Sequence, residues 1–178
     1  MFVTSKDDGL IPFVLTQILD ACVNGVTLSD PDLPDNPVIY ANKAFEEMSG
    51  YSQDEILGRN CRFLQGDDRD QECLATIREA LAKNGACVVT LRNYRKNKEL
   101  FLNRLSIRPL VDRDNNVIYY LGVQYDVTNE VKAQEEIEKL HFEIDRRAGA
   151  RGVAGVTAPD SVQELLPRLL ERPKYAVL

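Results

Sequence analysis

The nonapeptide GRNCRFLQG, residues 58–66, sets a cysteine among charged and amide side chains. Asn60 directly precedes Cys61 and Arg62 directly follows it, and Gln65 lies four residues after Cys61. A buried structural cysteine normally lies among apolar residues, and a zinc-binding cysteine normally has a partner at CxxC spacing. Cys61 fits neither pattern, so the rest of the sequence has to explain its polar surroundings.

The chain has the composition of an acidic globular protein. It contains 178 residues, of which 44% are hydrophobic and 28% charged, with a net charge of −6. This charge argues against nucleic acid as the main partner, because phosphate binding needs clustered positive charge. No run approaches the ~20 apolar residues of a membrane span, and the N-terminus MFVTSKDDG is too polar for a signal peptide. We therefore expect a cytoplasmic protein with reduced thiols that does not associate with a membrane.

The residues that usually mark a metal site or an enzyme are missing. The four cysteines, Cys22, Cys61, Cys73 and Cys87, include no CxxC pair, and His141 is the only histidine. These facts disfavour a zinc site and Cys/His catalysis. The sequence also lacks a GxxxxGK[ST] loop and a GxSxG elbow. We therefore expect no enzymatic activity and no bound metal.

The order of the predicted elements indicates an α+β domain. Apolar residues at helical spacing predict a helix over 11–22, and the Asp- and Pro-rich stretch 25–42 predicts two strands joined by a turn. Asn42 and the Ser52–Glu55 capping box predict two short helices. A longer helix and three β segments follow, at 68–85, 86–95, 100–111 and 116–127. One antiparallel sheet with helices stacked on one face accommodates this order.

The C-terminal part is predicted to be helical and then irregular. Residues 128–147 are strongly helical, and Val131, Ile137 and Ile144 fall near a 3.5-residue repeat. This spacing suits a short coiled coil or a helix docked on the sheet. A loop rich in small residues follows, and SVQELLPRLL, residues 161–170, predicts one last short helix.

Three amides occupy positions where alternation would place apolar side chains. Asn93, Asn103 and Gln124 each share a strand face with apolar residues. Turns centred on Lys98 and on residues 113–114 would set Asn93 opposite Asn103, and Asn103 opposite Gln124. A buried unpaired amide costs about 1–3 kcal/mol, so the three need partners. They either bond one another or water, or bind a ligand edge that alternates acceptors with a donor, such as a pyrimidine-like ring.

Together these features resemble the LOV (light-oxygen-voltage) photoreceptor domains, a flavin-binding branch of the PAS fold. The motif match is unbroken from Gly58 to Gln65, and the resemblance covers roughly residues 12–128, including DPDLPDNPVIYAN, LRNYRK, FLNRLSIRP and YYLGVQYDVT. It implies a five-stranded antiparallel sheet with short helices on one face, flanked by N- and C-terminal helices. The implied parts are an N-terminal helical cap (1–22), a flavin-binding LOV/PAS domain (23–128), a linker helix (129–147) and a tail (148–178).

The resemblance also implies a role for each matching residue. Cys61 would be the photoactive thiol, which forms a reversible thioether to ring carbon 4a of a flavin excited by blue light. Asn93 and Asn103 would bind the pyrimidine edge of the ring, and Gln124 would reorient and pass the signal to the sheet. The remaining matches are phosphate contacts at Arg62 and Arg78, ribityl contacts at Asn60 and Gln65, and a ring pocket lined by Phe45, Ile77, Leu91, Leu105, Ile107 and Gly122.

The flavin implied by this comparison is FMN. The segment between Gln65 and Arg78 is short, whereas family members that accommodate the adenine of FAD have an insertion there. FAD and riboflavin are therefore less favoured. One departure from the family pattern is Gly25, where plant members commonly have a polar side chain.

The function implied is that of a short blue-light photoreceptor without an enzymatic effector. We expect a homodimer formed through the terminal helices, with a separate protein as the downstream partner. A flavin-based redox sensor and the sensory fragment of a histidine kinase are the alternatives. A DNA-binding role is disfavoured by the acidic charge.

Overall fold

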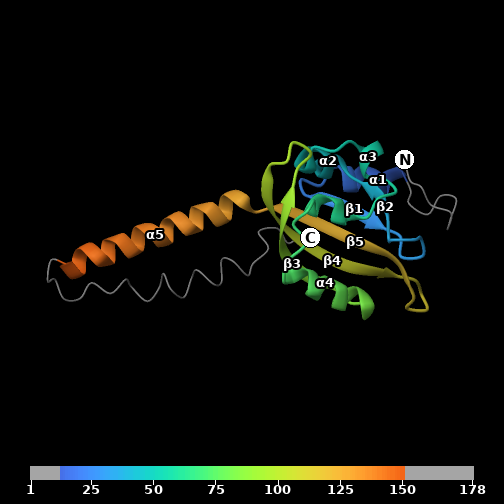
Figure 1. Ribbon diagram of the computed structural model, residues 1–178. Coiled ribbons are helices and arrows are strands. Elements are labelled where there is room, and N and C mark those ends of the chain that lie inside the picture. The colour runs from blue at the N-terminus through green and yellow to red at the C-terminus, as the bar shows by residue number, and fades with distance from the viewer. Residues whose placement is uncertain (1–12, 151–178) are drawn as a thin grey trace. The chain divides into compact units, whose positions relative to one another are not determined.

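A computed structural model describes residues 13–150 of the chain (Figure 1). The first two residues of the helix predicted at 11–22, and the short helix predicted at 161–170, lie outside the described residues. Among the described helices, none combines the length and the apolar character that crossing a membrane requires. The chain divides into two units after Val131, so the division falls within the last helix.

The elements follow the order expected from the sequence. The helices are α1 (Phe13–Asp20), α2 (Lys43–Ser49), α3 (Gln53–Ile56), the 3₁₀ helix η1 (Cys61–Gln65), α4 (Cys73–Ala82) and α5 (Thr128–Ala150). The strands are β1 (Gly25–Ser29), β2 (Val38–Ala41), β3 (Cys87–Tyr94), β4 (Leu100–Val111) and β5 (Val117–Asp126). The predicted capping box at Ser52 is present, and Asn42 caps α2.

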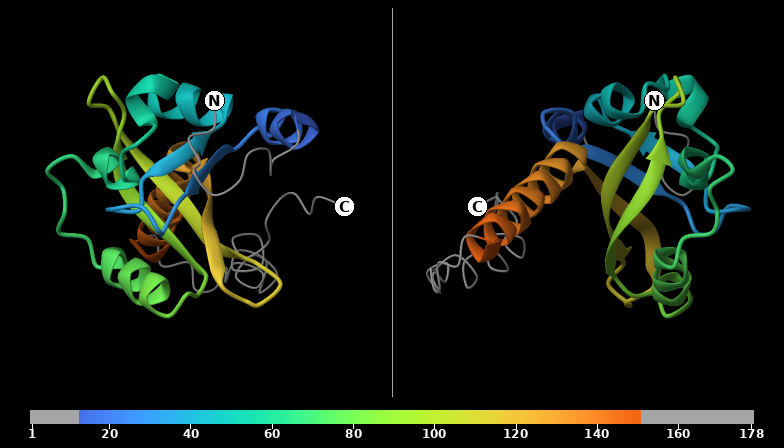
Figure 2. Two further views of the ribbon diagram at one scale, coloured as in Figure 1. Left: turned by 90° about the vertical axis from the view of Figure 1, so that its right-hand side faces the viewer. Right: turned by 60° about the vertical axis from the view of Figure 1, so that its left-hand side comes forward.

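The five strands form one antiparallel sheet in the order β2-β1-β5-β4-β3. The helices α2, α3 and α4 lie on one face of it (Figure 2). On the other face, Val26, Leu28 and Tyr119 form a buried cluster, against which Leu19 at the end of α1 packs. This arrangement is the predicted α+β fold, with the N-terminal helix on the opposite side of the sheet from the short helices.

The predicted strand register is wrong by two residues in both hairpins. Asn103 lies opposite Leu91 and Asp126, where the sequence analysis placed Asn93 and Gln124. The turn between β4 and β5 contains a register shift after Leu110, which symmetric counting from a turn centre does not foresee. Since side chains alternate with period two, a shift of two residues keeps every side chain on its face. The three amides therefore still share a face but lie diagonally.

The predicted helix at 68–85 begins five residues late, at Cys73. The cause is a set of side-chain bonds to the edge strand β3. The Gln71 amide accepts from the Arg92 N–H at 2.8 Å and donates to the Arg92 carbonyl at 3.0 Å. The Asp68 carboxylate accepts from two nitrogens of the Arg92 guanidinium, each at 2.7 Å. These contacts tie residues 68–71 to the edge strand β3 and satisfy backbone groups of Arg92 that an edge strand would leave open.

Asn42 joins three elements through a fully buried side chain. Its Oδ1 accepts from the backbone N–H groups of Val26, at 2.8 Å, and Phe45, at 3.0 Å. Its Nδ2 donates to the carbonyls of Leu19 and Asn24, both at 2.9 Å. One amide therefore ties the end of α1 and the strand β1 to the first turn of α2.

Replacing this amide should destabilise the domain strongly. We expect Asn42→Ala to lower the free energy of unfolding by about 3 kcal/mol, because four buried backbone groups lose their partner. Urea denaturation followed by circular dichroism measures the change. Asn129→Ala, at an exposed position in α5, is the matched control and should leave the midpoint unchanged. Equal midpoints for Asn42→Ala and the control would contradict this role of Asn42.

Candidate functional site

A cavity of about 450 Å³ lies against the face of the sheet that carries the helices. Its volume is within the ~300–1,000 Å³ of small-molecule sites. Strands β1, β3, β4 and β5, helices η1 and α4, and the loop before β2 supply its walls. The lining residues are Thr27, Ser29, Asn36, Asn60, Cys61, Arg62, Leu64, Gln65, Arg69, Leu74, Ile77, Arg78, Leu81, Leu91, Asn93, Asn103, Leu105, Ile107, Tyr120, Gly122 and Gln124.

Every predicted site residue except Phe45 lines this cavity. Phe45 is fully buried in an apolar cluster with Val38, Ile56 and Leu64. Its ring fills the space beside Gly25, where an added Cβ would lie 3.2 Å from the Phe45 ring. The structure therefore places Phe45 in the core behind the cavity, and of this cluster only Leu64 also lines the cavity wall.

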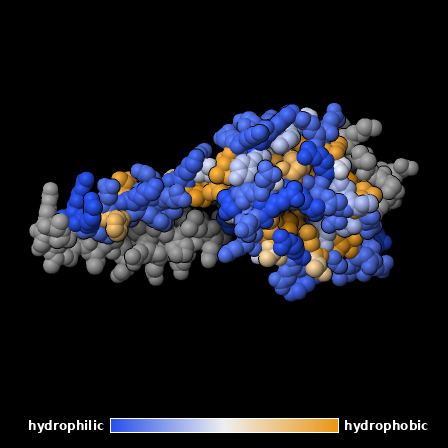
Figure 3. Space-filling view, viewed as in Figure 1, coloured by the Kyte–Doolittle hydropathy of each residue, from blue (hydrophilic) through white to orange (hydrophobic). Residues whose placement is uncertain are grey.

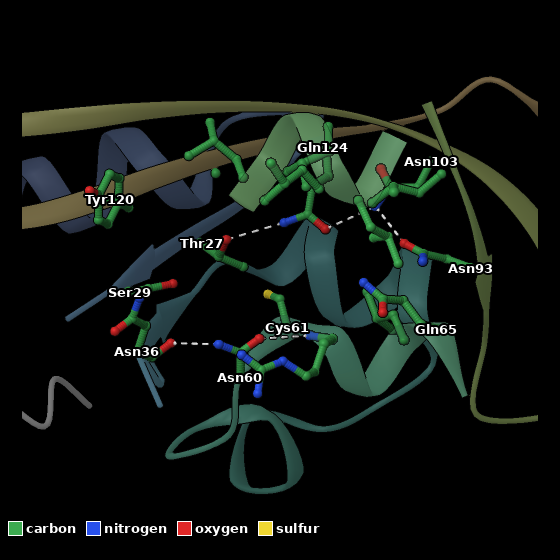
Figure 4. A pocket seen from close by; sticks show the side chains of 18 of the residues that line it. Thr27, Ser29, Asn36, Asn60, Cys61, Gln65, Asn93, Asn103, Tyr120 and Gln124 are labelled. Carbon is green, nitrogen blue, oxygen red and sulfur yellow. Dashed lines mark hydrogen bonds between the residues drawn. The ribbon is translucent and has the colours of Figure 1, made fainter. Parts of the chain in front are cut away.

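The three amides form a continuous hydrogen-bonded row across β3, β4 and β5 (Figure 4). The Asn103 Nδ2 donates to Asn93 Oδ1 at 2.9 Å and to Gln124 Oε1 at 3.3 Å. Gln124 Nε2 continues the row by donating to the Thr27 hydroxyl at 3.1 Å. All four side chains are at most 2% exposed. The alternative that the amides bond one another is thus correct, but it does not satisfy all their polar atoms.

One acceptor in this row has no partner. The Asn103 Oδ1 is the only buried side-chain nitrogen or oxygen within the described part of the chain that makes no hydrogen bond. Leaving such a group unpaired costs about 1–3 kcal/mol. Because Asn103 lines the cavity, a ligand with an N–H group at this wall would remove that cost.

The cysteine thiol faces the same cavity. Cys61 begins η1, whose N-cap Asn60 accepts a bond from the Arg62 N–H at 3.0 Å. The sulfur points toward the part of the cavity where Thr27 and Gln124 lie (Figure 4). Burial raises the pKa of the Cys61 thiol to about 11, and the adjacent Thr27 hydroxyl opposes this shift. At neutral pH the thiol therefore keeps its proton, as a neutral group placed beside a ligand.

Three guanidinium groups line the cavity. Arg62 forms an ion pair with Asp35 in which both side chains are half exposed, so the pair contributes little to stability. Within the described residues, the Arg69 guanidinium donates to the Gly66 carbonyl, at 3.3 Å. The Arg78 guanidinium, in α4, has no hydrogen-bond or ion-pair partner among residues 13–150. Arginine matches phosphate geometry well, and this set can hold a dianion.

Among the polar residues of the lining, the sequence analysis missed Thr27, Ser29, Asn36, Arg69 and Tyr120. Thr27 lies opposite Gly122 in the β1–β5 pair, and a Cβ added at Gly122 would come within 2.6 Å of the Thr27 hydroxyl oxygen. The Thr27 hydroxyl thus leaves no room for a side chain at position 122, which the sequence analysis had assigned only to the ring pocket. The sequence could have indicated Thr27, because Gly25, Thr27 and Ser29 alternate along β1 and so share one face of the strand. For Arg69, the signal was its place in the short segment between Arg62 and Arg78, the two predicted phosphate contacts.

These residues fit a flavin nucleotide. The amide row with its unpaired acceptor suits a ring edge that alternates carbonyls with an N–H group. The apolar side chains of Leu91, Leu105 and Ile107 can contact a flat ring, and the guanidinium groups can hold its phosphate. The cavity therefore offers a matching group for each chemical part of the ligand.

Comparison with known proteins agrees with this geometry. The family model for the PAS domain matches residues 23–129. A solved light-oxygen-voltage domain studied with a flavin analogue is 39% identical, with a TM-score of 0.63, and the match covers 75% of this chain and 99% of that domain. The chain belongs to the LOV branch of the PAS domain family. This LOV domain thus has the fold and the family expected from its sequence, and its homologues imply a flavin chromophore.

Curated relatives of the LOV domain include photoreceptors with different outputs. The "Blue-light photoreceptor" of Listeria innocua is 44% identical over 133 residues, covering 75% of this chain and 52% of that protein. "Blue-light-activated histidine kinase 1" of Erythrobacter litoralis is 37% identical over 157 residues, covering 83% and 44%. The chain spans about half the length of these relatives or less. The comparisons therefore show the sensory domain and leave the output of the whole protein to be proposed.

The contact between Thr27 and Gly122 leads to a stability prediction. Gly122→Ala should lower the free energy of unfolding by about 2 kcal/mol, because the new methyl group overlaps the Thr27 hydroxyl. Adding Thr27→Ala removes that oxygen and should recover part of the loss. Urea denaturation of the single and double variants measures the coupling. Gly85→Ala, whose Cβ would meet only ordinary contacts, is the control, and additive effects at 122 and 27 would contradict the overlap.

Proposed function

We propose that this LOV domain senses blue light through a bound FMN and a reversible thioether formed by Cys61. The observation that carries the proposal is the neutral Cys61 thiol, which faces the cavity walled by the buried amide row. A thiol in this position can reach a ring whose polar edge is bound by Asn93 and Asn103. The amides therefore set the position of the ring, and the thiol adds the reactive atom.

The bound flavin supplies a ring that absorbs blue light and becomes open to attack by a thiol at carbon 4a. Cys61 would contribute the electron pair of the new sulfur–carbon bond and give up its thiol proton to the neighbouring ring nitrogen. On dark recovery Cys61 would take back both the electron pair, at Sγ, and the proton. The raised pKa of Cys61 keeps the proton on sulfur before illumination, so both the atom that bonds and the proton that moves are in place.

The preference for FMN is supported by the cationic part of the cavity. Arg62, Arg69 and Arg78 can neutralise a terminal phosphate. The short connection from Gln65 to Arg78 adds no further element that could cover an adenine. We therefore propose FMN as the native chromophore, with Asn60 and Gln65 beside the ribityl chain.

Gln124 is the proposed start of the signal. Its amide accepts from Asn103 and donates to Thr27, so a new proton on the ring beside it favours a rotated amide. Two residues later on β5, Asp126 is paired with Arg95 and accepts from the Thr128 N–H at 3.0 Å. Thr128 is the first residue of α5, and its hydroxyl accepts from the Leu102 N–H at 2.9 Å. A change of strain in β5 therefore reaches the first residues of α5 over a short path.

The output that we propose is a change in a homodimer formed through α1 and α5. On α5, Ile137, Leu140 and Ile144 are between 45% and 62% exposed, and apolar side chains stand out on this otherwise hydrophilic helix (Figure 3). Such a stripe suits a helix of a second copy. Light would shift an existing equilibrium between two dimer arrangements, which a separate protein partner then reads. The net charge of −6 disfavours nucleic acid as that partner.

Cys61 tests the light reaction directly. We expect Cys61→Ala to retain a yellow bound flavin but to lose the reversible blue-light bleaching completely, because no sulfur is left to form the bond. Absorption spectra before illumination, after it and during dark recovery measure this loss. Cys87→Ala, which alters a cysteine outside the cavity lining, is the control and should bleach and recover like the unaltered protein.

The same two proteins also test the proposed change in the homodimer. Size exclusion with light scattering, run in darkness and under blue light, measures their mass and hydrodynamic size. The unaltered protein should change its oligomeric state or hydrodynamic size on illumination, and Cys61→Ala should not. Full bleaching with dark recovery in Cys61→Ala would refute the proposed role of the thiol. An identical elution in both light conditions for the unaltered protein would refute the dimer output alone.

Arg78 tests the choice of flavin. We expect Arg78→Ala to weaken FMN binding by about tenfold or more, since a charge-assisted bond contributes about 1.5–3 kcal/mol. Riboflavin has no phosphate, so its affinity should stay the same. Fluorescence titration of the flavin-free protein with each compound measures both affinities. Arg113→Ala, in the exposed β4–β5 turn, is the control; an equal loss for the two flavins would mean that Arg78 supports the fold and not the phosphate.

A further inference from the structure

Thr27 connects the two groups on which the proposed light reaction depends. Its side chain is 2% exposed on β1, and its hydroxyl accepts from Gln124 Nε2 at 3.1 Å. The Cys61 sulfur points toward this hydroxyl and toward Gln124 (Figure 4). The absence of a side chain at Gly122 leaves the room that the hydroxyl occupies. The Thr27 hydroxyl therefore neighbours both the Cys61 thiol and the proposed relay amide.

The bonding capacity of a hydroxyl makes this position informative. A hydroxyl has one hydrogen to donate and two lone pairs that accept. Since the Thr27 oxygen accepts from Gln124, its own hydrogen is available for the Cys61 sulfur. The Thr27 hydroxyl accordingly lowers the pKa of Cys61, against the larger effect of burial. The direction of this effect is that of a hydrogen bond donated to sulfur, which favours negative charge there.

We propose that Thr27 is a positioning residue that couples the orientation of the Gln124 amide to hydrogen bonding at the Cys61 sulfur. This inference rests on the proposed function and deepens it. With Nε2 toward Thr27, as in this structure, the hydroxyl oxygen accepts from Gln124 and its hydrogen is free to be donated to the nearby sulfur. With the amide rotated, Oε1 faces Thr27, and the hydroxyl hydrogen turns to that oxygen and leaves the sulfur. One hydrogen atom thus serves either the thiol or the relay, never both.

The coupling acts on dark recovery. In this step Cys61 would take back the electron pair of the sulfur–carbon bond at Sγ, and the ring nitrogen would return its proton to the sulfur. Negative charge builds up on sulfur as the bond breaks, and a hydrogen bond donated by Thr27 stabilises it. That bond is available once Gln124 has turned its Nε2 toward Thr27. Return of the relay amide and release of the thiol therefore favour each other.

The test compares substitutions that keep or remove the hydroxyl. Thr27→Val has nearly the same shape but no hydroxyl, and we expect dark recovery to slow about tenfold, equivalent to about 1.4 kcal/mol in the barrier. Thr27→Ser keeps the hydroxyl, so its dark recovery should stay within about twofold of the unaltered rate. Thr90→Val makes the same chemical change at an exposed position of β3, and its recovery should be unchanged.

A second measurement does not depend on the photocycle. The full chain prepared without flavin is treated with iodoacetamide at about pH 8, where a small fraction of a high-pKa thiol is reactive. Peptide-resolved mass spectrometry separates Cys61 from Cys22, Cys73 and Cys87. We expect Cys61 to react several-fold more slowly in Thr27→Val than in the unaltered protein, and Thr27→Ser to restore the rate.

The outcomes separate this inference from the proposed function. If the unaltered protein does not bleach reversibly, the proposed function fails. If it bleaches and recovers, but Thr27→Val recovers at the unaltered rate, the coupling through Thr27 is wrong. The coupling is also wrong if Thr27→Ser is as slow as Thr27→Val, since the cause would then be packing. The inference is supported if Thr27→Val recovers slowly while Thr27→Ser and Thr90→Val do not, and if Cys61 is alkylated slowly in Thr27→Val.

Discussion

The unmet hydrogen-bonding capacity of a buried amide row is the constraint on which the rest of this structure depends. Asn93, Asn103, Gln124 and Thr27 bond one another in series, yet the Asn103 Oδ1 has no partner. An apolar wall of the same shape would be more stable without a ligand, because an unpaired buried acceptor is costly. The row is therefore arranged for a molecule that completes it, and it holds that molecule in one orientation relative to the Cys61 sulfur.

The faces of the strands could be predicted from the sequence, while their register could not. Alternation of side chains assigns each amide to a face whatever the pairing, so an error of two residues in both hairpins left the amide row intact. The shift after Leu110 depends on turn geometry that composition does not reveal. The start of α4 was missed for a related reason. Asp68 and Gln71 have residue types typical of a first helical turn, but their side chains bond to β3 instead.

The site itself was predictable where a distinctive local motif identified it. GRNCRFLQG and the three strand amides located about half of the polar cavity lining, and the family resemblance added Arg78. Phe45 was placed in the lining by resemblance, and only the packing of α2 beside Gly25 shows that it belongs to the core. Thr27 is an ordinary strand residue in sequence, and its significance comes from partners at positions 61, 122 and 124, which only the folded chain brings together.

The same few side chains connect the cavity with both ends of the domain. Thr27 lies on β1 beside Val26, whose N–H is bonded to Asn42, and Asn42 reaches the Leu19 carbonyl in α1. Gln124 lies on β5 two residues before Asp126, which is bonded to Thr128 at the start of α5. Rotation of one amide would thus alter strain on two neighbouring strands at once, and each strand leads to a terminal helix. Because β1 and β5 are paired with Thr27 directly opposite Gly122, a shift at the cavity acts on both routes together. A thiol reaction that changes only a few bonds can therefore alter both helices proposed to form the dimer.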